Sequence, residues 1–67
     1  DVLNVRTKAS GTNAIITVVD AAGRTVRTLR SQGGLTEVPV GGLQAGTYTL
    51  RVQYGTTIEE ARFVKLP

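Results

Sequence analysis

The chain of 67 residues contains no cysteine, histidine, methionine or tryptophan, and its only aromatic residues are two tyrosines and one phenylalanine. Without cysteine no disulfide can form, and without cysteine or histidine a zinc site lacks its usual sulfur and nitrogen ligands. The same absences exclude nucleophilic catalysis of the Ser-His or Cys-His kind. A core this small gives little stability by itself, so agreement between turns and strands, or contact with a neighbouring domain, must supply it.

Acidic side chains are few and scattered. Glu59 and Glu60 are neighbours in a predicted strand, so they point to opposite faces and cannot act on one substrate. No loop carries two acids, whereas a calcium site needs several oxygen ligands. Asp20 is interpreted as a turn-forming residue rather than a general base. We therefore expect no enzymatic activity, no metal and no cofactor.

The net charge of +3 comes from eight Lys and Arg against five Asp and Glu. The arginines are scattered along predicted strands, which is typical of a mixed polar surface. Nucleic-acid-binding surfaces combine a basic stripe with aromatic platforms, so no nucleic-acid partner is expected. No stretch approaches the roughly 18 apolar residues that span a bilayer, so no membrane insertion is expected. The chain opens at Asp1 rather than methionine, and we expect it to be a fragment of a longer polypeptide.

Strand composition dominates the sequence: glycine recurs at short intervals, and the runs between are rich in Val, Ile, Thr, Tyr and Leu. The clearest run has Tyr48, Leu50, Val52 and Tyr54 alternating with polar residues, which predicts one dry and one wet face. No window shows helical spacing free of glycine or threonine clusters. The predicted strands are 2–8, 14–19, 24–31, 35–40, 47–54 and 57–66.

Three strands carry irregular signals. Residues 14–19 are nearly all apolar, which indicates either a strand covered on both faces or a bulge. The odd spacing of Val26 and Leu29 indicates a bulge in the next strand. Pro39 cannot donate a ladder hydrogen bond, so it marks an edge or an end. The apolar residues of 57–66 keep no single phase, so the inward face of that strand stays undecided.

The turn signals complete the fold prediction. Asp20 suits the first position of a type I turn and Gly23 the left-handed position that ends it, which predicts a four-residue hairpin loop. Residues 10–13 are also predicted to turn. Gly33-Gly34 and Gly41-Gly42 are interpreted as turns, since neither pair leads into a helix or precedes a lysine. We expect an all-β, immunoglobulin-like antiparallel β-sandwich with Greek-key topology and six to seven strands, in one domain over 1–67.

The pattern Leu43-x-x-Gly46-x-Tyr48 predicts a tyrosine corner. In that arrangement a tyrosine at the start of a strand donates its hydroxyl back to the preceding turn. Gly46 is expected to allow the close approach. Such a corner indicates a Greek-key sandwich and does not indicate a function.

Four segments together carry a family resemblance: 1–5 (DVLNV), 19–26 (VDAAGRTV), 43–52 (LQAGTYTLRV) and 63–65 (FVK). In their order and spacing they resemble the C-terminal sorting domain of the bacterial type IX secretion system. That family has a "D-x-L-x-V" strand, a "D-x-x-G-[RK]-x-V" hairpin, an "L-x-x-G-x-Y" corner and a lysine near the C-terminus. A Pro-Asn-Pro element that precedes the first strand in the family would fall upstream of Asp1.

The resemblance implies a delivery role. The domain would end a cargo protein linked before it, pass through the periplasm, and be recognised by the type IX outer-membrane translocon. A sortase would then remove it or exchange it for a surface anchor, leaving the cargo at the cell surface or secreted. By the same resemblance, Leu43, Gly46 and Tyr48 hold the fold, while the hairpin from Asp20 through Gly23 to Arg24, together with Lys65, is expected to be recognised.

Two alternatives stay open. The chain is also similar to immunoglobulin-like or fibronectin-like accessory modules, including carbohydrate-binding ones, of extracellular enzymes or adhesins. A sugar-binding module would present Tyr54 and Phe63 as exposed, coplanar rings. The hairpin and corner also look like the β-sandwich of flagellar hook-capping proteins. An edge-strand dimer of the isolated domain is left open as well.

Overall fold

A computed structural model describes residues 2–7, 13–31 and 34–67. These residues form six β-strands and no helix, so none of them lies in a helix that could cross a membrane. The all-β prediction is confirmed. The predicted turn at 10–13 lies outside the described residues except for Asn13, as do Lys8 and Gly33. The strands are β1 (Val2–Thr7), β2 (Ala14–Val19), β3 (Thr25–Ser31), β4 (Gly34–Pro39), β5 (Gly46–Tyr54) and β6 (Thr57–Lys65).

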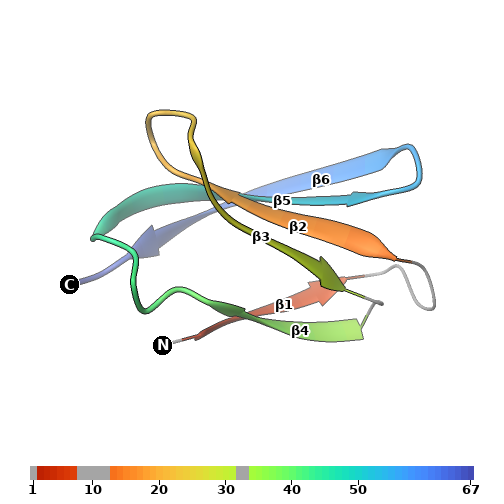
Figure 1. Cartoon of the computed structure of the whole chain (residues 1–67), viewed down its shortest axis with the longest axis horizontal. Helices are drawn as coiled ribbons and strands as arrows, with labels where there is room; N and C mark the ends of the chain where they lie inside the picture. The colour runs from red at the N-terminus through yellow and green to blue at the C-terminus, as the bar shows by residue number, and fades with distance from the viewer. Residues whose placement is uncertain (1, 8–12, 32–33) are drawn as a thin grey trace.

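The strands form two antiparallel sheets. One pairs β1 with β4, and the other has the order β3-β2-β5-β6. In Figure 1 the small sheet lies below the four-stranded one, and the chain leaves the larger sheet after β3 and returns to it at β5. Six antiparallel strands in two sheets agree with the expected strand count. The immunoglobulin-like Greek key remains a prediction.

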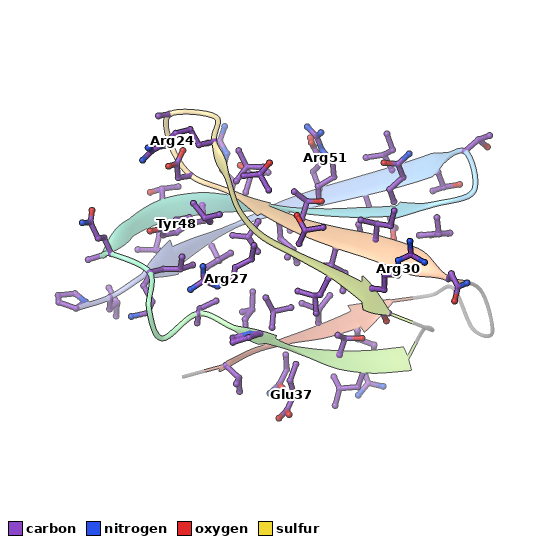
Figure 2. All side chains as sticks on the ribbon, viewed as in Figure 1. Arg24, Arg27, Arg30, Glu37, Tyr48 and Arg51 are labelled. Carbon is purple, nitrogen blue, oxygen red and sulfur yellow. The ribbon has the colours of Figure 1, made fainter. Side chains whose placement is uncertain are left out.

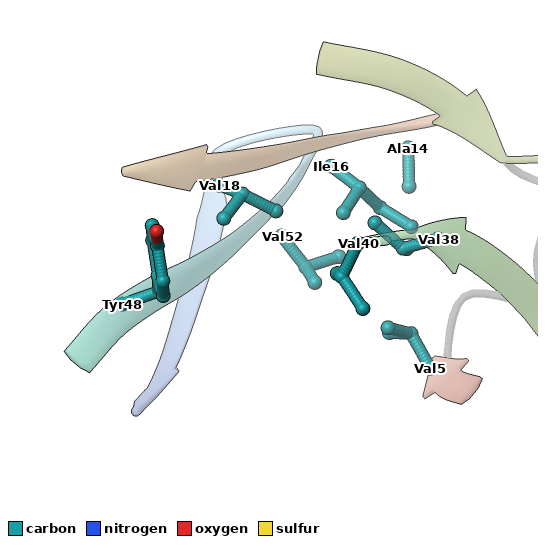
Figure 3. Close-up of a cluster of buried hydrophobic side chains, with 8 residues drawn as sticks. All are labelled: Val5, Ala14, Ile16, Val18, Val38, Val40, Tyr48 and Val52. Atoms are coloured by element: carbon teal, nitrogen blue, oxygen red, sulfur yellow. The ribbon is translucent and has the colours of Figure 1, made fainter. Parts of the chain in front are cut away.

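The core lies between the sheets because each strand turns alternate residues inward. In β2, Ala14, Ile16 and Val18 are fully buried, while Ile15 on the opposite face is 43% exposed. Of the two interpretations of the apolar run 14–19, coverage of both faces is therefore wrong. Figure 3 shows the side chains that form this core. They are Val5, Ala14, Ile16, Val18, Val38, Val40, Tyr48 and Val52.

A bulge interrupts the pairing of β2 with β3. Val18 is paired with Arg27 but Val19 is paired with Thr25, so Val26 has no opposite residue. The bulge predicted from the spacing of Val26 and Leu29 is confirmed, and both side chains pack against the core. Bulges increase the local twist of a strand.

Side chains of β3 bind the small sheet. The Nε atom of Arg27 donates to the carbonyl oxygen of Pro39 at 3.3 Å. The hydroxyls of Ser31 and Thr36 lie 2.5 Å apart in a second link between β3 and β4. Pro39 is the last residue of β4, as its missing N–H predicted. These contacts hold the two sheets together along the β3–β4 side.

Candidate functional site

The β2–β3 hairpin is organised by one carboxylate. Asp20 Oδ1 accepts hydrogen bonds from the backbone N–H groups of Ala22, at 3.0 Å, and Arg24, at 2.9 Å. The backbone N–H of Gly23 donates to the Asp20 carbonyl at 3.0 Å, and Gly23 has φ +87°. Such a left-handed φ is readily adopted by glycine and strained for other residues. Asp20 and Gly23 therefore have the turn-forming roles that the sequence predicted.

The same carboxylate binds the Arg24 side chain. Arg24 Nε lies 3.2 Å from Asp20 Oδ2. The pKa of Asp20 is lowered, first by the hydrogen bond from the Arg24 backbone N–H and further by the Arg24 side chain and the Ala22 N–H. All these donors favour the ionised carboxylate. The Asp20 side chain is only 16% exposed, whereas that of Arg24 is 81% exposed. The Asp20 carboxylate is therefore largely shielded from solvent, while the Arg24 guanidinium is exposed on the hairpin.

Tyr48 forms the predicted corner. Its hydroxyl donates to the carbonyl oxygen of Gln44 at 2.6 Å, and its side chain is 7% exposed. Upstream, the Leu43 N–H donates to the Val40 carbonyl at 3.0 Å, and Leu43 packs against the core. A tyrosine that is buried and also donates a hydrogen bond fixes both its packing and the path of the preceding loop.

Gly46 serves the corner in a different way from the one expected. A Cβ atom built on Gly46 would have no atom within 4 Å, so space for close approach is not what this position requires. Its φ of +156° is the requirement, because residues with a side chain rarely adopt that backbone conformation. The steric explanation is wrong, and the conformational one replaces it.

The fold brings the hairpin and the corner together. A surface depression of about 260 Å³ is lined by Asp20, Ala21 and Ala22 on one side and by residues 44–48 on the other. Figure 1 places this hairpin, the start of β5 and the end of β6 at one end of the molecule, opposite the β5–β6 turn. Figure 2 shows Arg24 on the hairpin and Tyr48 on β5. We call the assembly of 20–24, 43–48 and Lys65 the motif end.

Lys65 joins the motif end through sheet pairing. It is the cross-strand partner of Gly46, and two residues earlier Phe63 is the partner of Tyr48. Lys65 is half-buried, and its Nζ atom donates to the carbonyl oxygen of Leu66 at 3.4 Å. The residues singled out in the sequence, from three separate segments, therefore occupy one end of the fold.

The family assignment rests on the sequence match. A family model described as "Secretion system C-terminal sorting domain" matches residues 1–65. The chain belongs to this family. No curated protein and no solved structure matches the chain. The resemblance to the type IX sorting domain is confirmed, and the chain is a non-catalytic sorting domain whose cargo is secreted or displayed at the cell surface.

Acidic clusters and exposed aromatic rings are the features by which the described part of the sorting domain would show a metal or sugar site. The described residues contain no group of three acidic side chains that could hold an ion. Tyr54 and Phe63 are half-buried against the core, and the Tyr54 hydroxyl donates to Glu59 Oε1 at 3.1 Å. Burial and the neighbouring Glu59 carboxylate raise the pKa of Tyr54. The exposed, coplanar rings that a carbohydrate-binding module would present are not found at these two positions.

Sequence reasoning missed two arginines of the sorting domain. Arg27 was counted among the scattered surface cations, but it binds the Pro39 carbonyl and donates Nη1 to the Val26 carbonyl at 2.7 Å. Arg51 points away from the small sheet in Figure 2 and pairs with Glu60 on β6, Nε to Oε2, at 2.8 Å. The only sequence signal for the Arg51–Glu60 pair is their opposite charge, because it depends on the β5–β6 register.

Proposed function

We propose that this sorting domain directs a cargo linked before it through the outer-membrane translocon of the type IX system, and that the translocon recognises the motif end. In this proposal 1–67 is a single domain of a larger exported protein. It crosses the periplasm with its cargo and is then removed, or exchanged for a surface anchor, by a sortase.

One observation carries the assignment to the motif end. The hairpin, the corner and Lys65 are separate in sequence. In the fold the hairpin and the corner border one depression, and Lys65 pairs with Gly46 of the corner across β5 and β6. A purely structural role would explain Tyr48 and Gly46, because one is buried and the other has a restricted backbone. It explains Arg24 only in part, because the Nε atom binds Asp20 Oδ2 but the side chain is 81% exposed on the hairpin. Packing does not require a charged side chain at a solvent-exposed position, so a contact role fits Arg24 better.

Within the motif end, residues divide by exposure. Tyr48, Gly46 and Leu43 hold the corner, while Asp20 and Gly23 shape the hairpin. Arg24 and Lys65 supply cationic groups for an acidic surface of the translocon. The Tyr48 corner also supports the immunoglobulin-like Greek-key interpretation of the two sheets, since tyrosine corners recur in such sandwiches.

The test is secretion of a reporter placed between a signal peptide and this chain, in a host with the type IX apparatus. We expect the reporter outside the cell with the native chain. Arg24→Gln should raise the fraction of reporter retained in the periplasm several-fold. Lys65→Gln should also raise this fraction. Arg30→Gln is the matched control, because Arg30 is also exposed but lies on β3 away from the motif end (Figure 2).

Two outcomes count against the proposal at different levels. Periplasmic retention of the native fusion, with the domain folded, contradicts the export role itself. Equal secretion of the Arg24, Lys65 and Arg30 variants contradicts the motif end as the recognised surface while leaving the export role in place. Thermal unfolding of each purified variant shows that the comparison is made between folded domains.

A further inference from the structure

β6 is an edge of the four-stranded sheet, and one side of it is unpaired in the part of the chain that the structure describes. It pairs with β5 over all nine of its residues, from Thr57 to Lys65. Alternate residues of such an edge strand turn their N–H and C=O groups away from the sheet. Most of its side chains are exposed as well. Another strand can therefore add to this edge without displacing anything described.

The outward face of β6 has a self-complementary chemical pattern: read in the opposite direction, each acidic position meets a basic one and each apolar position an apolar one. Ile58, Glu60, Arg62 and Val64 share this face, since the intervening residues pair with the inward residues of β5. Their order is apolar, acidic, basic, apolar. Ile58 is 54% exposed and Val64 is 64% exposed, so more than half of each apolar residue is accessible to solvent.

We propose that β6 is the interface of a two-fold symmetric homodimer, in which β6 of one copy pairs antiparallel with β6 of a second copy and Ala61 lies opposite Ala61. In this register Glu60 lies opposite Arg62 of the second copy, and Arg62 lies opposite its Glu60. Ile58 lies opposite Val64 of the second copy, and Val64 lies opposite its Ile58. Opposite charges and apolar pairs directly across an antiparallel ladder are stabilising. An isologous interface requires this self-complementarity.

The neighbouring symmetric registers are unfavourable. With the axis at Glu60, the Glu60 carboxylates of the two copies would lie opposite each other. With the axis at Arg62, two guanidinium groups would meet. Like charges directly opposite each other destabilise a strand pair. Ala61 is the axis position that pairs every outward residue with a complementary one, and its small side chain lets the two copies approach.

The inward face accepts the same register. Thr57 lies opposite Lys65 of the second copy. Glu59 is the diagonal neighbour of that Lys65. Carboxylate and ammonium groups at diagonal positions remain within reach of long side chains. Glu60 also retains its own Arg51: the pair is half-exposed, with the Glu60 side chain 49% accessible, so a second cation can approach the carboxylate.

The other edge of this sheet is protected against such pairing. β3 carries the bulge at Val26, and its Arg27 and Ser31 side chains bind β4. Bulges and covering elements are the usual ways in which an edge strand is kept from pairing. β6 has neither among the described residues, which selects it as the dimer edge. The contact is a single strand pair, so it buries little area and is expected to be reversible and concentration-dependent.

Charge variants test the register directly in the full 67-residue chain. Glu60→Arg and Arg62→Glu each place two like-charge pairs across the two-fold axis, so each alone should weaken self-association by about tenfold or more. An equimolar mixture of the two variants restores both opposite-charge pairs and should associate as the native chain does. Arg30→Glu, the control on β3, should leave association unchanged. Sedimentation velocity over a concentration series compares these four samples with the native chain.

The mixture separates the proposal from loss of folding, because a variant that fails to fold is not rescued by another. A second measurement uses the absence of native cysteine. Ala61→Cys should form a disulfide-linked dimer on oxidation, much faster than Glu59→Cys, whose copies would not lie opposite each other. A native chain that stays monomeric at all concentrations overturns the proposal. So does a dimer whose strength of association the charge variants do not change, as expected for a dimer formed by exchange of β6 between copies. None of these outcomes depends on the export role.

Discussion

Tyr48 of β5 lies directly opposite Phe63 of β6, with ring centroids 5.5 Å apart and planes 20° apart. The Tyr48 hydroxyl meanwhile binds the Gln44 carbonyl in the connection before β5. One side chain thus joins three segments: the loop after β4, the strand β5 and the final strand. Stacked aromatic pairs contribute beyond the area they bury. Losing Tyr48 should therefore disturb the whole motif end and not the corner alone.

Tyr48→Phe and Tyr48→Ala separate the hydrogen bond from the packing. The phenylalanine variant keeps the stacked ring but leaves the Gln44 carbonyl without its donor, so we expect a loss of about 1–2 kcal/mol in the free energy of unfolding. The alanine variant also loses a buried ring and should cost about 3–5 kcal/mol. Urea denaturation of both proteins measures the difference. A phenylalanine variant as stable as the native chain would show that the corner hydrogen bond contributes nothing.

Gly46→Ala tests backbone strain in the absence of a clash. The new methyl group would meet no atom within 4 Å, but φ is +156°, so we expect a loss of about 1–3 kcal/mol. Gly42→Ala is the opposite case and the control. Its Cβ would lie 3.1 Å from Arg27 Nη2, which is neither of the two Arg27 atoms that bind the Pro39 and Val26 carbonyls, so a shift of that atom by a few tenths of an ångström relieves the contact. The φ of Gly42 is not in the left-handed range. It should change stability by less than about 1 kcal/mol. Equal losses for both variants would contradict the strain explanation.

The lowered pKa of Asp20 predicts an acid-dependent loss of stability. Because the pKa is lower in the folded chain than in the unfolded chain, the ionised carboxylate stabilises the fold fully above the unfolded value, about 3.9. That contribution disappears as the pH falls through the folded pKa. Asp20→Asn keeps an acceptor for the backbone N–H groups and removes the charge. The native chain should have the higher thermal midpoint at neutral pH, and the gap should close below about pH 4. A gap that stays constant down to pH 2 would contradict the assignment.

Local sequence patterns predicted most of the strands because their causes are local. The strict alternation of β5 puts Tyr48 and Val52 inside, and the signals of Asp20 and Gly23 set the turn after β2. Strand limits were correct to within one residue at each end that the structure describes. The bulge could be predicted too, since one extra residue changes the spacing of Val26 and Leu29.

The inward face of β6 could not be predicted, because an edge strand with little cover on either face shows little hydrophobic bias. Val64 is outward and 64% exposed, while Glu59 is inward, so apolar and charged residues do not sort by face. Only the register opposite β5 decides the phase. The pairing of Gly46 with Lys65 and the bond from Arg27 to Pro39 likewise depend on contacts between distant segments. The sequence identified the residues of the motif end, and the fold determined how they meet.

Arg27 provides the last prediction, because its side chain links the two sheets. Its Nε atom binds the Pro39 carbonyl at 3.3 Å while Nη1 binds the Val26 carbonyl at 2.7 Å. Arg27→Ala removes both donors and should lower the free energy of unfolding by about 1–2 kcal/mol. Arg27→Lys should recover only part, since one ammonium group does not reproduce the planar fork. Arg30→Ala, an exposed change on the same strand, should stay within about 0.5 kcal/mol of the native chain. Hydrogen exchange at β4 amides such as Val38 should be faster in Arg27→Ala than in Arg30→Ala. Equal exchange rates in the two variants would contradict the role of Arg27 in holding the small sheet in place.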